Sequence, residues 1–228
     1  MDVDPSRISV IVPALNEAEV IEGVLQPLKS AGFTIVLVDD GSTDNTFDLV
    51  NSLGIDVIRH SINLGQGAAL QTGFEYFKRN PQLGDYLVTY DADGQHLPGN
   101  VISLVERLVL ENVDVALGSR FIEGKFGGGR LKYVILRVSA KLARYSIGLR
   151  VTDRHNGLRA FKRSAAVRIS LKQPGFGHAD EILRQIKSLG LTYVEVPVEI
   201  IYTPYSRKKG QPLVNGINIL FDKFLGQR

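Results

Sequence analysis

Two aspartates one residue apart, Asp91 and Asp93, follow a strand-like stretch in the segment VTYDADGQH, residues 88–96. Carboxylates this close repel each other, and the repulsion raises their pKa values unless a cation neutralises them. Oxygen ligands without cysteine or suitably spaced histidines suit Mg²⁺ or Mn²⁺, and phosphate oxygens commonly complete the coordination of these ions. The spacing therefore predicts a divalent cation held by Asp91 and Asp93 that bridges a diphosphate.

Acidic side chains recur at the ends of two earlier strand-like stretches. Pro13-Ala14-Leu15-Asn16-Glu17 follows the first stretch, and Asp39-Asp40-Gly41-Ser42 follows the second. In open α/β sheets, ligands bind beyond the carboxyl ends of the strands. We therefore expect these segments to share one edge with Asp91 and Asp93, where Asp40 and Glu17 are placed for ribose hydroxyls or a base.

Each segment also has a purely structural interpretation. Asn16 is a suitable cap for a helix that starts at Glu17, and Ser42 or Thr43 for the next helix. Asp40-Gly41 suits a plain turn, and loop aspartates commonly face solvent. None of these interpretations explains why five carboxylates gather at three strand ends.

Strand-like and helical patterns alternate through the first 118 residues. The expected strands cover residues 8–12, 34–38, 56–59, 86–90 and 113–118, and the expected helices cover 17–30, 44–53, 67–78 and a stretch from Pro98. Regular alternation of this kind predicts an α/β fold with a doubly wound, mostly parallel sheet flanked by helices. The length of 228 residues suits a single domain.

The composition excludes several classes of site. The chain has no cysteine, which excludes disulfides, thiolate zinc sites and cysteine nucleophiles. Its start, MDVDPSR, is acidic where a signal peptide would be basic, and no apolar run is long enough to span a bilayer. We expect a cytoplasmic location.

Charge is divided unevenly along the chain. Residues 1–100 carry a net charge of −9 and residues 101–228 a net charge of +12. This asymmetry indicates an anionic partner for the second half, although a solvated basic face is the simpler alternative. Within residues 127–150, three arginines recur every seven residues beside apolar positions, which predicts a basic amphipathic helix lying on a membrane surface. Packing against the core or a homodimer contact is the alternative, here and for the amphipathic tail 211–228.

An ordered set of motifs carries a family resemblance from about residue 8 to residue 210. The motifs are VIVPALNEAEVI (10–21), VDDGSTDNT (38–46), NLGQGAAL (63–70), YDADGQHLP (90–98), GSRF (118–121), DRHNGLRAFKR (153–163) and EVPVEIIY (195–202). With them the chain resembles a family 2 glycosyltransferase of the GT-A fold, close to the dolichyl- and polyprenyl-phosphate mannosyl- and glucosyltransferases. Residues 1–210 would form this domain, with a nucleotide-sugar and metal half (1–118) and an acceptor half (119–210).

The resemblance implies a reaction and a set of site residues. The reaction is metal-dependent, inverting transfer of a hexose from a GDP- or UDP-sugar to a polyprenyl or dolichyl phosphate at the cytoplasmic surface of a membrane, where a separate membrane protein could hold the enzyme. The metal (Mg²⁺ or Mn²⁺) would be bound by the DxD motif Asp91 and Asp93 with Gln95. The donor would contact Pro13, Ala14, Asn16, Glu17, Asp40, Gly41, Gln66, Asp91, Ala92 and Asp93. The acceptor phosphate would be bound by Arg120, Arg159 and Arg207, and the catalytic set would be Asp91, Asp93, Arg120 and Asp180.

One departure from the family pattern leaves the acceptor open. Relatives that use polyprenyl phosphates commonly resemble Arg-x-x-Gly-x-Ser-Lys near the end of the domain, whereas residues 207–212 read Arg-Lys-Lys-Gly-Gln-Pro. The alternative acceptor is a sugar hydroxyl, for which Asp180 would be the expected base. A non-catalytic nucleotide-binding module is a more distant alternative. The glycines of 63–73 do not match the dinucleotide fingerprint, and no nucleic-acid-binding module is present.

Overall fold

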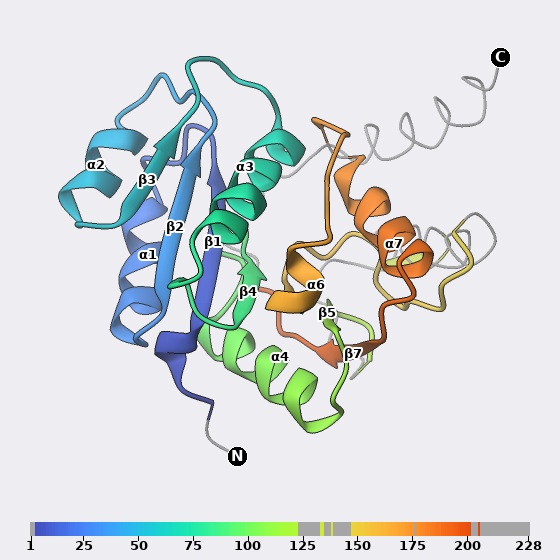
Figure 1. The fold of residues 1–228 in the computed structure, drawn as a ribbon. Helices are drawn as coiled ribbons and strands as arrows, with labels where there is room; N and C mark the ends of the chain where they lie inside the picture. Colours follow the sequence, from blue (N-terminus) through green and yellow to red (C-terminus); the bar gives the residue numbers. More distant parts are fainter. Residues whose placement is uncertain are drawn as a thin grey trace, which may run out of the picture.

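The computed structural model describes residues 3–122, 133–134, 138, 147–175, 177–201 and 205, and the described strands form one seven-stranded sheet (Figure 1). The strands are β1 (Ile8–Ala14), β2 (Thr34–Asp39), β3 (Asp56–Arg59), β4 (Tyr86–Thr89), β5 (Val115–Ser119), β6 (Arg159–Lys162) and β7 (Tyr193–Pro197). Their order across the sheet is β3-β2-β1-β4-β6-β5-β7, and β6 alone among them runs antiparallel to its neighbours.

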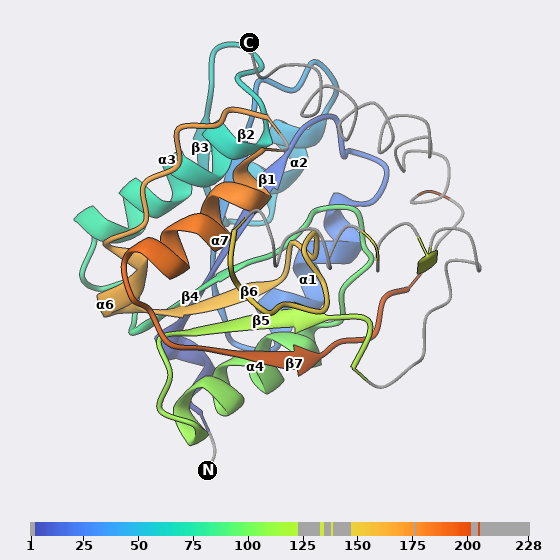
Figure 2. The same cartoon turned by 90° about the vertical axis from the view of Figure 1, so that its right-hand side faces the viewer.

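Helices cover both faces of this sheet. They are α1 (Ile21–Ser30), α2 (Thr46–Ser52), α3 (Gln66–Arg79), α4 (Pro98–Leu110), α6 (Arg163–Ala166) and α7 (His178–Ser188), after a short 3₁₀ turn at Pro5–Arg7. The apolar residues of α1, α2 and α4 belong to one buried cluster, and those of α3, α6 and α7 belong to the other. In Figure 2, α3, α6 and α7 lie together on one side of the sheet.

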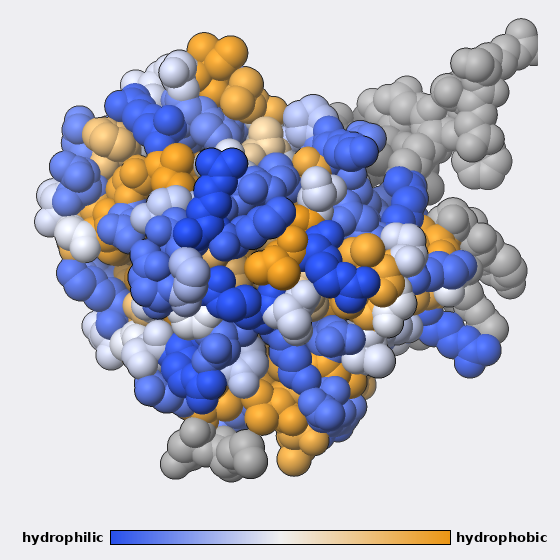
Figure 3. Space-filling model, viewed as in Figure 1, coloured by the Kyte–Doolittle hydropathy of each residue, from blue (hydrophilic) through white to orange (hydrophobic). Residues whose placement is uncertain are grey.

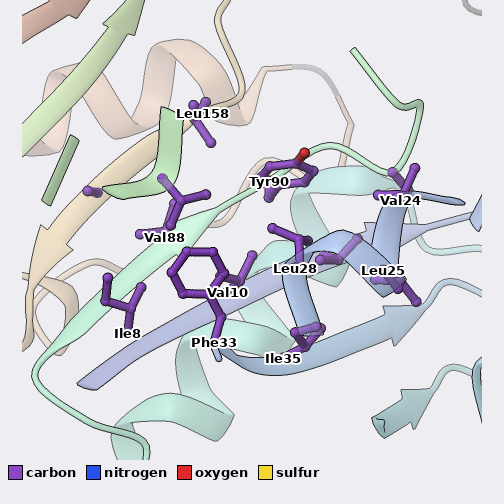
Figure 4. Packing of buried hydrophobic residues seen from close by; sticks show 14 of the residues in the cluster. Ile8, Val10, Val24, Leu25, Leu28, Phe33, Ile35, Val88, Tyr90 and Leu158 are labelled. Atoms are coloured by element: carbon purple, nitrogen blue, oxygen red, sulfur yellow. The ribbon is translucent and has the colours of Figure 1, made fainter. Parts of the chain in front are cut away.

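The alternation of side chains along β1 explains why both faces are covered. Val10 and Val12 enter the cluster under α1 and α4, whereas Ile11 points to the opposite face and packs under α3. All three side chains are completely buried, as expected for a central parallel strand with helices on both sides. Figure 4 shows Val10 among the residues of the first cluster, close to Val88 and Phe33.

The antiparallel strand β6 determines which loops meet at the carboxyl edge of the sheet. Thr89, at the end of β4, pairs with Arg159, at the start of β6. The loop that precedes β6 therefore lies beside the residues that follow β4, which are Asp91 and Asp93. Hence β6 brings the second half of the chain to the edge where the first half gathers its acids.

The structure confirms the α/β fold with a mostly parallel sheet, and it moves some element boundaries. The predicted helix over 17–30 begins only at Ile21, and β1 extends to Ala14. Residues between them form a loop at the carboxyl edge. Most of the predicted amphipathic helix over 127–150, the tail 211–228 and Arg207 lie outside the described residues.

The surface of the described residues is mixed in character. Figure 3 shows hydrophilic side chains over much of the face seen in Figure 1, interrupted by separate apolar patches. Within the described part of the chain, no helix is both long and apolar enough to cross a membrane.

The close contact between α3 and β1 can be tested at Gly73. A Cβ atom at this position would lie 2.2 Å from Cγ2 of the buried Ile11. We expect Gly73→Ala to lower the free energy of unfolding by about 1–3 kcal/mol, because overpacking outweighs the better helix propensity of alanine. Gly23 is the control, because it is exposed in α1 and a Cβ there would meet nothing within 4 Å. Urea unfolding should show that Gly23→Ala is neutral or stabilising; equal effects at both positions would contradict the packing argument.

Candidate active site

Two loops at the carboxyl edge, one after β1 and one after β2, are locked together by Asn16. Its side-chain Oδ1 accepts a hydrogen bond from the Thr43 amide at 2.9 Å, and its own amide donates to Ser42 Oγ at 2.9 Å. Asn16 adopts a left-handed backbone conformation with φ of 53°. Neither α1 nor α2 has a side-chain hydrogen bond at its N-cap, so the capping interpretation of Asn16, Ser42 and Thr43 is wrong. These residues instead fix the shape of the predicted donor loops.

Asp40 is buried and orders the loop that leads to α3. Its carboxylate accepts hydrogen bonds from the amides of Leu64 at 2.9 Å and Gly65 at 2.7 Å, and it lies 2.7 Å from Nδ1 of His60. Only 2% of the residue is exposed. Contact between Asp40 and a nucleoside stays a prediction.

Asp39, the residue before it, is completely buried at the end of β2. Its Oδ1 accepts a hydrogen bond from the Ser42 amide at 3.0 Å, and its Oδ2 lies 3.1 Å from Nε of Arg59. The contact with Arg59 is an ion pair but not a hydrogen bond, since Oδ2 of Asp39 has no hydrogen-bond partner. Asp39 therefore has a local cation, and its role in the described residues is to shape the loop.

The glycines of NLGQG allow a tight contact between two parts of the chain. The Pro174 carbonyl accepts hydrogen bonds from the amides of Gly67 at 2.7 Å and Ala68 at 3.2 Å, in the first turn of α3. A Cβ on Gly67 would lie 2.0 Å from the Gln173 carbonyl oxygen, and one on Gly65 would lie 2.4 Å from that of Pro174. The amides of Gly67 and Ala68 are thus already bonded within the chain, and the two glycines allow the close packing of these segments.

Asp91 lies at the open edge beyond β4, and its side chain is 29% exposed. Gln66 Nε2 donates to its Oδ1 at 3.0 Å, and His96 Nε2 lies 3.7 Å from its Oδ2. Burial raises the pKa of Asp91, but the nearby His96, His178 and Arg159 outweigh burial and leave this pKa below its usual range. Asp91 is therefore held in the charged form.

Asp93 has the opposite electrostatic character. Burial, followed by the charges of Asp91 and Glu17, raises its pKa to about 6, although a hydrogen bond from the Gln95 amide at 3.1 Å partly offsets this. Glu17 is itself 8% exposed. Three carboxylates from two strand ends thus influence one another, as the sequence predicts, while Asp39 and Asp40 have separate partners.

The carboxylates of Asp91 and Asp93 suit a magnesium or manganese ion whose remaining ligands are substrate phosphates and water. Within the described part of the chain, no set of three or more His, Asp or Glu side chains converges as a complete metal site. Ions of this type are commonly held by one or two carboxylates together with substrate phosphates and water. Asp91 and Asp93 are two such carboxylates: they repel each other, and the pKa of Asp93 is raised.

The sequence predicts Arg120 as a phosphate ligand and Asp180 as a possible base, without predicting the ion pairs that the structure shows. Arg120, at the end of β5, donates to Asp153 through Nε at 2.6 Å and through Nη2 at 2.7 Å. Arg154 makes a buried two-point ion pair with Asp180, the first-turn acid of α7. Asp180 is 4% exposed. The predicted phosphate ligand Arg120 and the predicted base Asp180 therefore each lie in an ion pair.

Glu195 on β7 anchors the loop that carries these pairs. Its Oε1 accepts hydrogen bonds from the amides of Thr152 at 2.7 Å and Asp153 at 3.3 Å, and from the Thr152 hydroxyl at 2.9 Å. Burial lowers the pKa of His155, in the same loop, to about 4, and the adjacent Arg154 acts in the same direction. His155 is therefore neutral at physiological pH.

A segment from the second half of the chain reaches the predicted donor loops. Tyr205 donates its hydroxyl hydrogen to Glu17 Oε2 at 2.6 Å, and the Ile201 amide donates to the Gln95 carbonyl at 2.9 Å. Gln95 and Glu17, predicted respectively to contact metal and donor, are thus linked to residues that follow β7. No short sequence signal marks Tyr205, because its partner is 188 positions away.

Comparison with known proteins assigns the family. The family model described as Glycosyl transferase family 2 matches residues 9–169. The chain belongs to this family. The same matched region contains β1 to β6, with Asp91, Asp93, Arg120 and Arg159.

Relatives of this family 2 glycosyltransferase extend over nearly the whole chain. An uncharacterized protein of Methanocaldococcus jannaschii is 35% identical, over 96% of this chain and 92% of its own. A UDP-N-acetylglucosamine–dolichyl-phosphate N-acetylglucosaminyltransferase of Methanococcus voltae is 31% identical, over 94% and 93%. A polyprenol monophosphomannose synthase of Mycolicibacterium smegmatis is 29% identical, over 93% and 83%.

A solved structure supports the GT-A fold of the glycosyltransferase. Glucosyl-3-phosphoglycerate synthase from Mycobacterium tuberculosis, crystallised with Mn²⁺, UDP and glucosyl-3-phosphoglycerate, superposes with a TM-score of 0.70. The match covers 92% of this chain and 74% of that chain at 23% identity. The predicted family and enzyme class are confirmed, whereas the individual site residues stay predictions.

The raised pKa of Asp93 predicts a cost in stability for the metal-free enzyme. A carboxyl group whose folded pKa lies above its unfolded value destabilises the fold at neutral pH, and this destabilisation disappears as pH falls from about 6 toward 4. Asp93→Asn keeps the Oδ1 acceptor, so we expect it to stabilise the metal-free protein at pH 7.5 by about 1–2 kcal/mol, after allowing for solvent screening. Urea unfolding at pH 7.5 and pH 5 measures the difference, which should shrink at pH 5. Glu106→Gln, at an exposed position on α4, is the control; a destabilised Asp93→Asn protein would contradict the electrostatic argument.

Proposed function

We propose that this family 2 enzyme transfers a hexose from a nucleotide-diphosphate sugar to a polyprenyl or dolichyl phosphate, with a divalent cation bound at Asp91 and Asp93. The observation that carries the proposal is the arrangement of charges at one sheet edge. Two carboxylates that repel each other lie beyond β4, and the ion pair Arg120–Asp153 lies beyond β5 in the same sheet.

The donor would lie over the loops that follow β1, β2 and β4. Gly41 lines an open depression of about 390 Å³ together with Ser42, Thr43, Arg59, His60 and Ser61. Volumes of a few hundred Å³ are typical of ligand pockets, so this depression is large enough for the nucleoside end of a donor. The nucleotide base is left open between guanine and uracil, and it is part of the test below.

Breaking the bond from the sugar to the diphosphate requires stabilisation of negative charge on the leaving group. A bound Mg²⁺ or Mn²⁺ supplies this as a Lewis acid. Asp91 and Asp93 would hold the ion, Gln95 is a further ligand candidate, and Gln66 orients Asp91 through the hydrogen bond to Oδ1. Because the Asp91 carboxylate is kept charged by its neighbours, it is ready to bind a cation at neutral pH.

A lipid phosphate is already anionic near neutral pH, so it needs cationic positioning more than a general base. Arg120 suits this task because Asp153 fixes the plane of its guanidinium through two hydrogen bonds. Several apolar side chains in the adjacent part of the chain are partly exposed, namely Ile122, Tyr133, Val134 and Val138. They support contact between this side of the enzyme and a membrane surface, where the acceptor is embedded.

One assay tests the reaction as a whole. The purified enzyme is incubated with Mn²⁺, a panel of GDP- and UDP-sugars and short polyprenyl phosphates, and products are identified by mass spectrometry. We expect a glycosylated polyprenyl phosphate that is lost in EDTA and in Asp93→Ala, with at least a thousandfold fall in rate, because the variant lacks one of the two carboxylates proposed to hold the metal. Glu106→Gln serves as the unaffected control. Full activity of Asp93→Ala in EDTA would refute the metal assignment, and a product on sugar hydroxyls alone would refute the acceptor assignment.

The ion pair of Asp180 distinguishes a phosphate acceptor from a hydroxyl acceptor. A general base contributes about 10²–10⁴ to the rate, whereas a buried ion-pair partner contributes mainly to stability. We expect Asp180→Asn to destabilise the fold by about 3 kcal/mol yet to keep kcat/KM within about tenfold at temperatures where the protein is folded. Arg154→Met breaks the same pair from the other side and should behave alike. A loss of a thousandfold or more in Asp180→Asn alone would identify Asp180 as the base and favour a sugar hydroxyl.

A further inference from the structure

Gly157 forms the surface against which the Asp91 carboxylate rests. A Cβ at Gly157 would lie 2.1 Å from Asp91 Oδ2 and 2.6 Å from Asp91 Cγ, so any larger residue would collide with the carboxylate. The Gly157 carbonyl accepts a hydrogen bond from the Thr89 hydroxyl at 2.6 Å. This bond joins the turn to the end of β4, two residues before Asp91. The position of the carboxylate therefore depends on the position of this turn.

The buried side chain of Arg159 stabilises this turn through hydrogen bonds to its backbone. Its Nε donates to the Asn156 carbonyl at 3.1 Å, and its Nη2 donates to the Arg154 carbonyl at 3.2 Å. The residue is 4% exposed and pairs in register with Thr89 across the β4–β6 ladder. Two carbonyls, two residues apart in the loop, are thus fixed by one rigid guanidinium, a geometry that the single ammonium of lysine cannot reproduce.

The charge of Arg159 acts on the same carboxylate. Burial lowers the pKa of Arg159 to about 10, so the guanidinium remains charged at neutral pH. The charges of Asp91, Asp153 and Asp180 all favour this charged form, and Arg159 in turn lowers the pKa of Asp91. A buried cation engaged with backbone carbonyls is poorly placed to leave its partners and bind the phosphate of a lipid.

We propose that Arg159 is a positioning residue for the donor metal: with Gly157 it fixes the place of the Asp91 carboxylate, and it does not bind the acceptor. This inference rests on the proposed function, because it requires a divalent cation at Asp91 and Asp93. It assigns to Arg159 a role different from the acceptor-phosphate contact implied by the family resemblance.

Binding of Mn²⁺ in the presence of UDP or GDP, whichever supports binding to the wild-type enzyme, and without acceptor, tests the proposal directly. The affinity is measured by water-proton relaxation on the folded full chain. We expect Arg159→Lys, which keeps the charge but loses the fork, and Gly157→Ala, which keeps Arg159 unchanged, each to weaken Mn²⁺ binding at least tenfold. Thr89→Val, which removes only the hydroxyl bond to the Gly157 carbonyl, should weaken it by a smaller factor of about two to five.

Arg163 provides a matched control. It lies just after β6, and its guanidinium donates to the carbonyls of Gly84 at 2.7 Å and Phe77 at 3.1 Å, so it also ties backbone segments together. Arg163→Lys should lower the unfolding temperature, as Arg159→Lys does, but should change the Mn²⁺ affinity less than twofold. Equal losses of Mn²⁺ affinity in both variants would reduce Arg159 to a general structural role and overturn the proposal.

Two further outcomes are distinguishable. Arg159→Lys could raise the KM for polyprenyl phosphate and leave Mn²⁺ binding unchanged. That result would show that Arg159 contacts the acceptor, and the inference would be wrong. If the wild-type enzyme itself binds Mn²⁺ with neither UDP nor GDP, the proposed metal dependence fails before the variants are compared. Should Arg159→Lys fail to fold, Gly157→Ala and Thr89→Val still decide the question, because unchanged Mn²⁺ affinity in both would exclude any role for this turn in placing Asp91.

Discussion

Repulsion among carboxylates at one sheet edge is the constraint that shapes this enzyme. The negative charge of each acid there is compensated in a different way. Asp39 pairs with Arg59, and Asp40 is surrounded by amides and His60, so both are buried without a ligand. Asp91 has a lowered pKa because of the neighbouring His96, His178 and Arg159, whereas Asp93 is only partly compensated and has a pKa of about 6. The fold thus concentrates its remaining electrostatic strain at one side chain, which is where a metal ion would relieve it.

Antiparallel strand β6 makes this arrangement possible. It enters the sheet between β4 and β5, so the loop before it lies beside Asp91 and the residues after β5 lie beside that loop. Residues 153–157, just before β6, then carry the partner of Arg120, the partner of Asp180 and the turn under Asp91. Glu195 on β7 fixes the start of the same loop. The proposed donor and acceptor sites are therefore joined through a few hydrogen bonds within one sheet.

Local patterns predicted the fold and the acidic edge, because strand periodicity and strand ends can be read along the chain. They did not predict where α1 begins: the apolar spacing is helical from Glu17, but the Glu17 amide is bound by the Thr46 hydroxyl, 29 residues away. The orientation of β6 could not be read from the four residues RAFK. The charge pairs of the second half, such as Arg154 with Asp180, were missed because each joins positions more than twenty residues apart. Resemblance located Arg120 and Arg159 without showing what they contact.

The place of β6 also has a consequence for how the chain folds as it is synthesised. In the sheet, β5 has only β6 and β7 as neighbours, and both follow it in the sequence. A nascent chain that ends near residue 119 can pair β1 to β4, but it leaves β4 as an open edge and β5 without a partner. Open edges of this kind invite pairing with other chains. Until residues 159–162 emerge, the incomplete sheet is an aggregation hazard, and a fragment limited to the donor half would keep that hazard permanently.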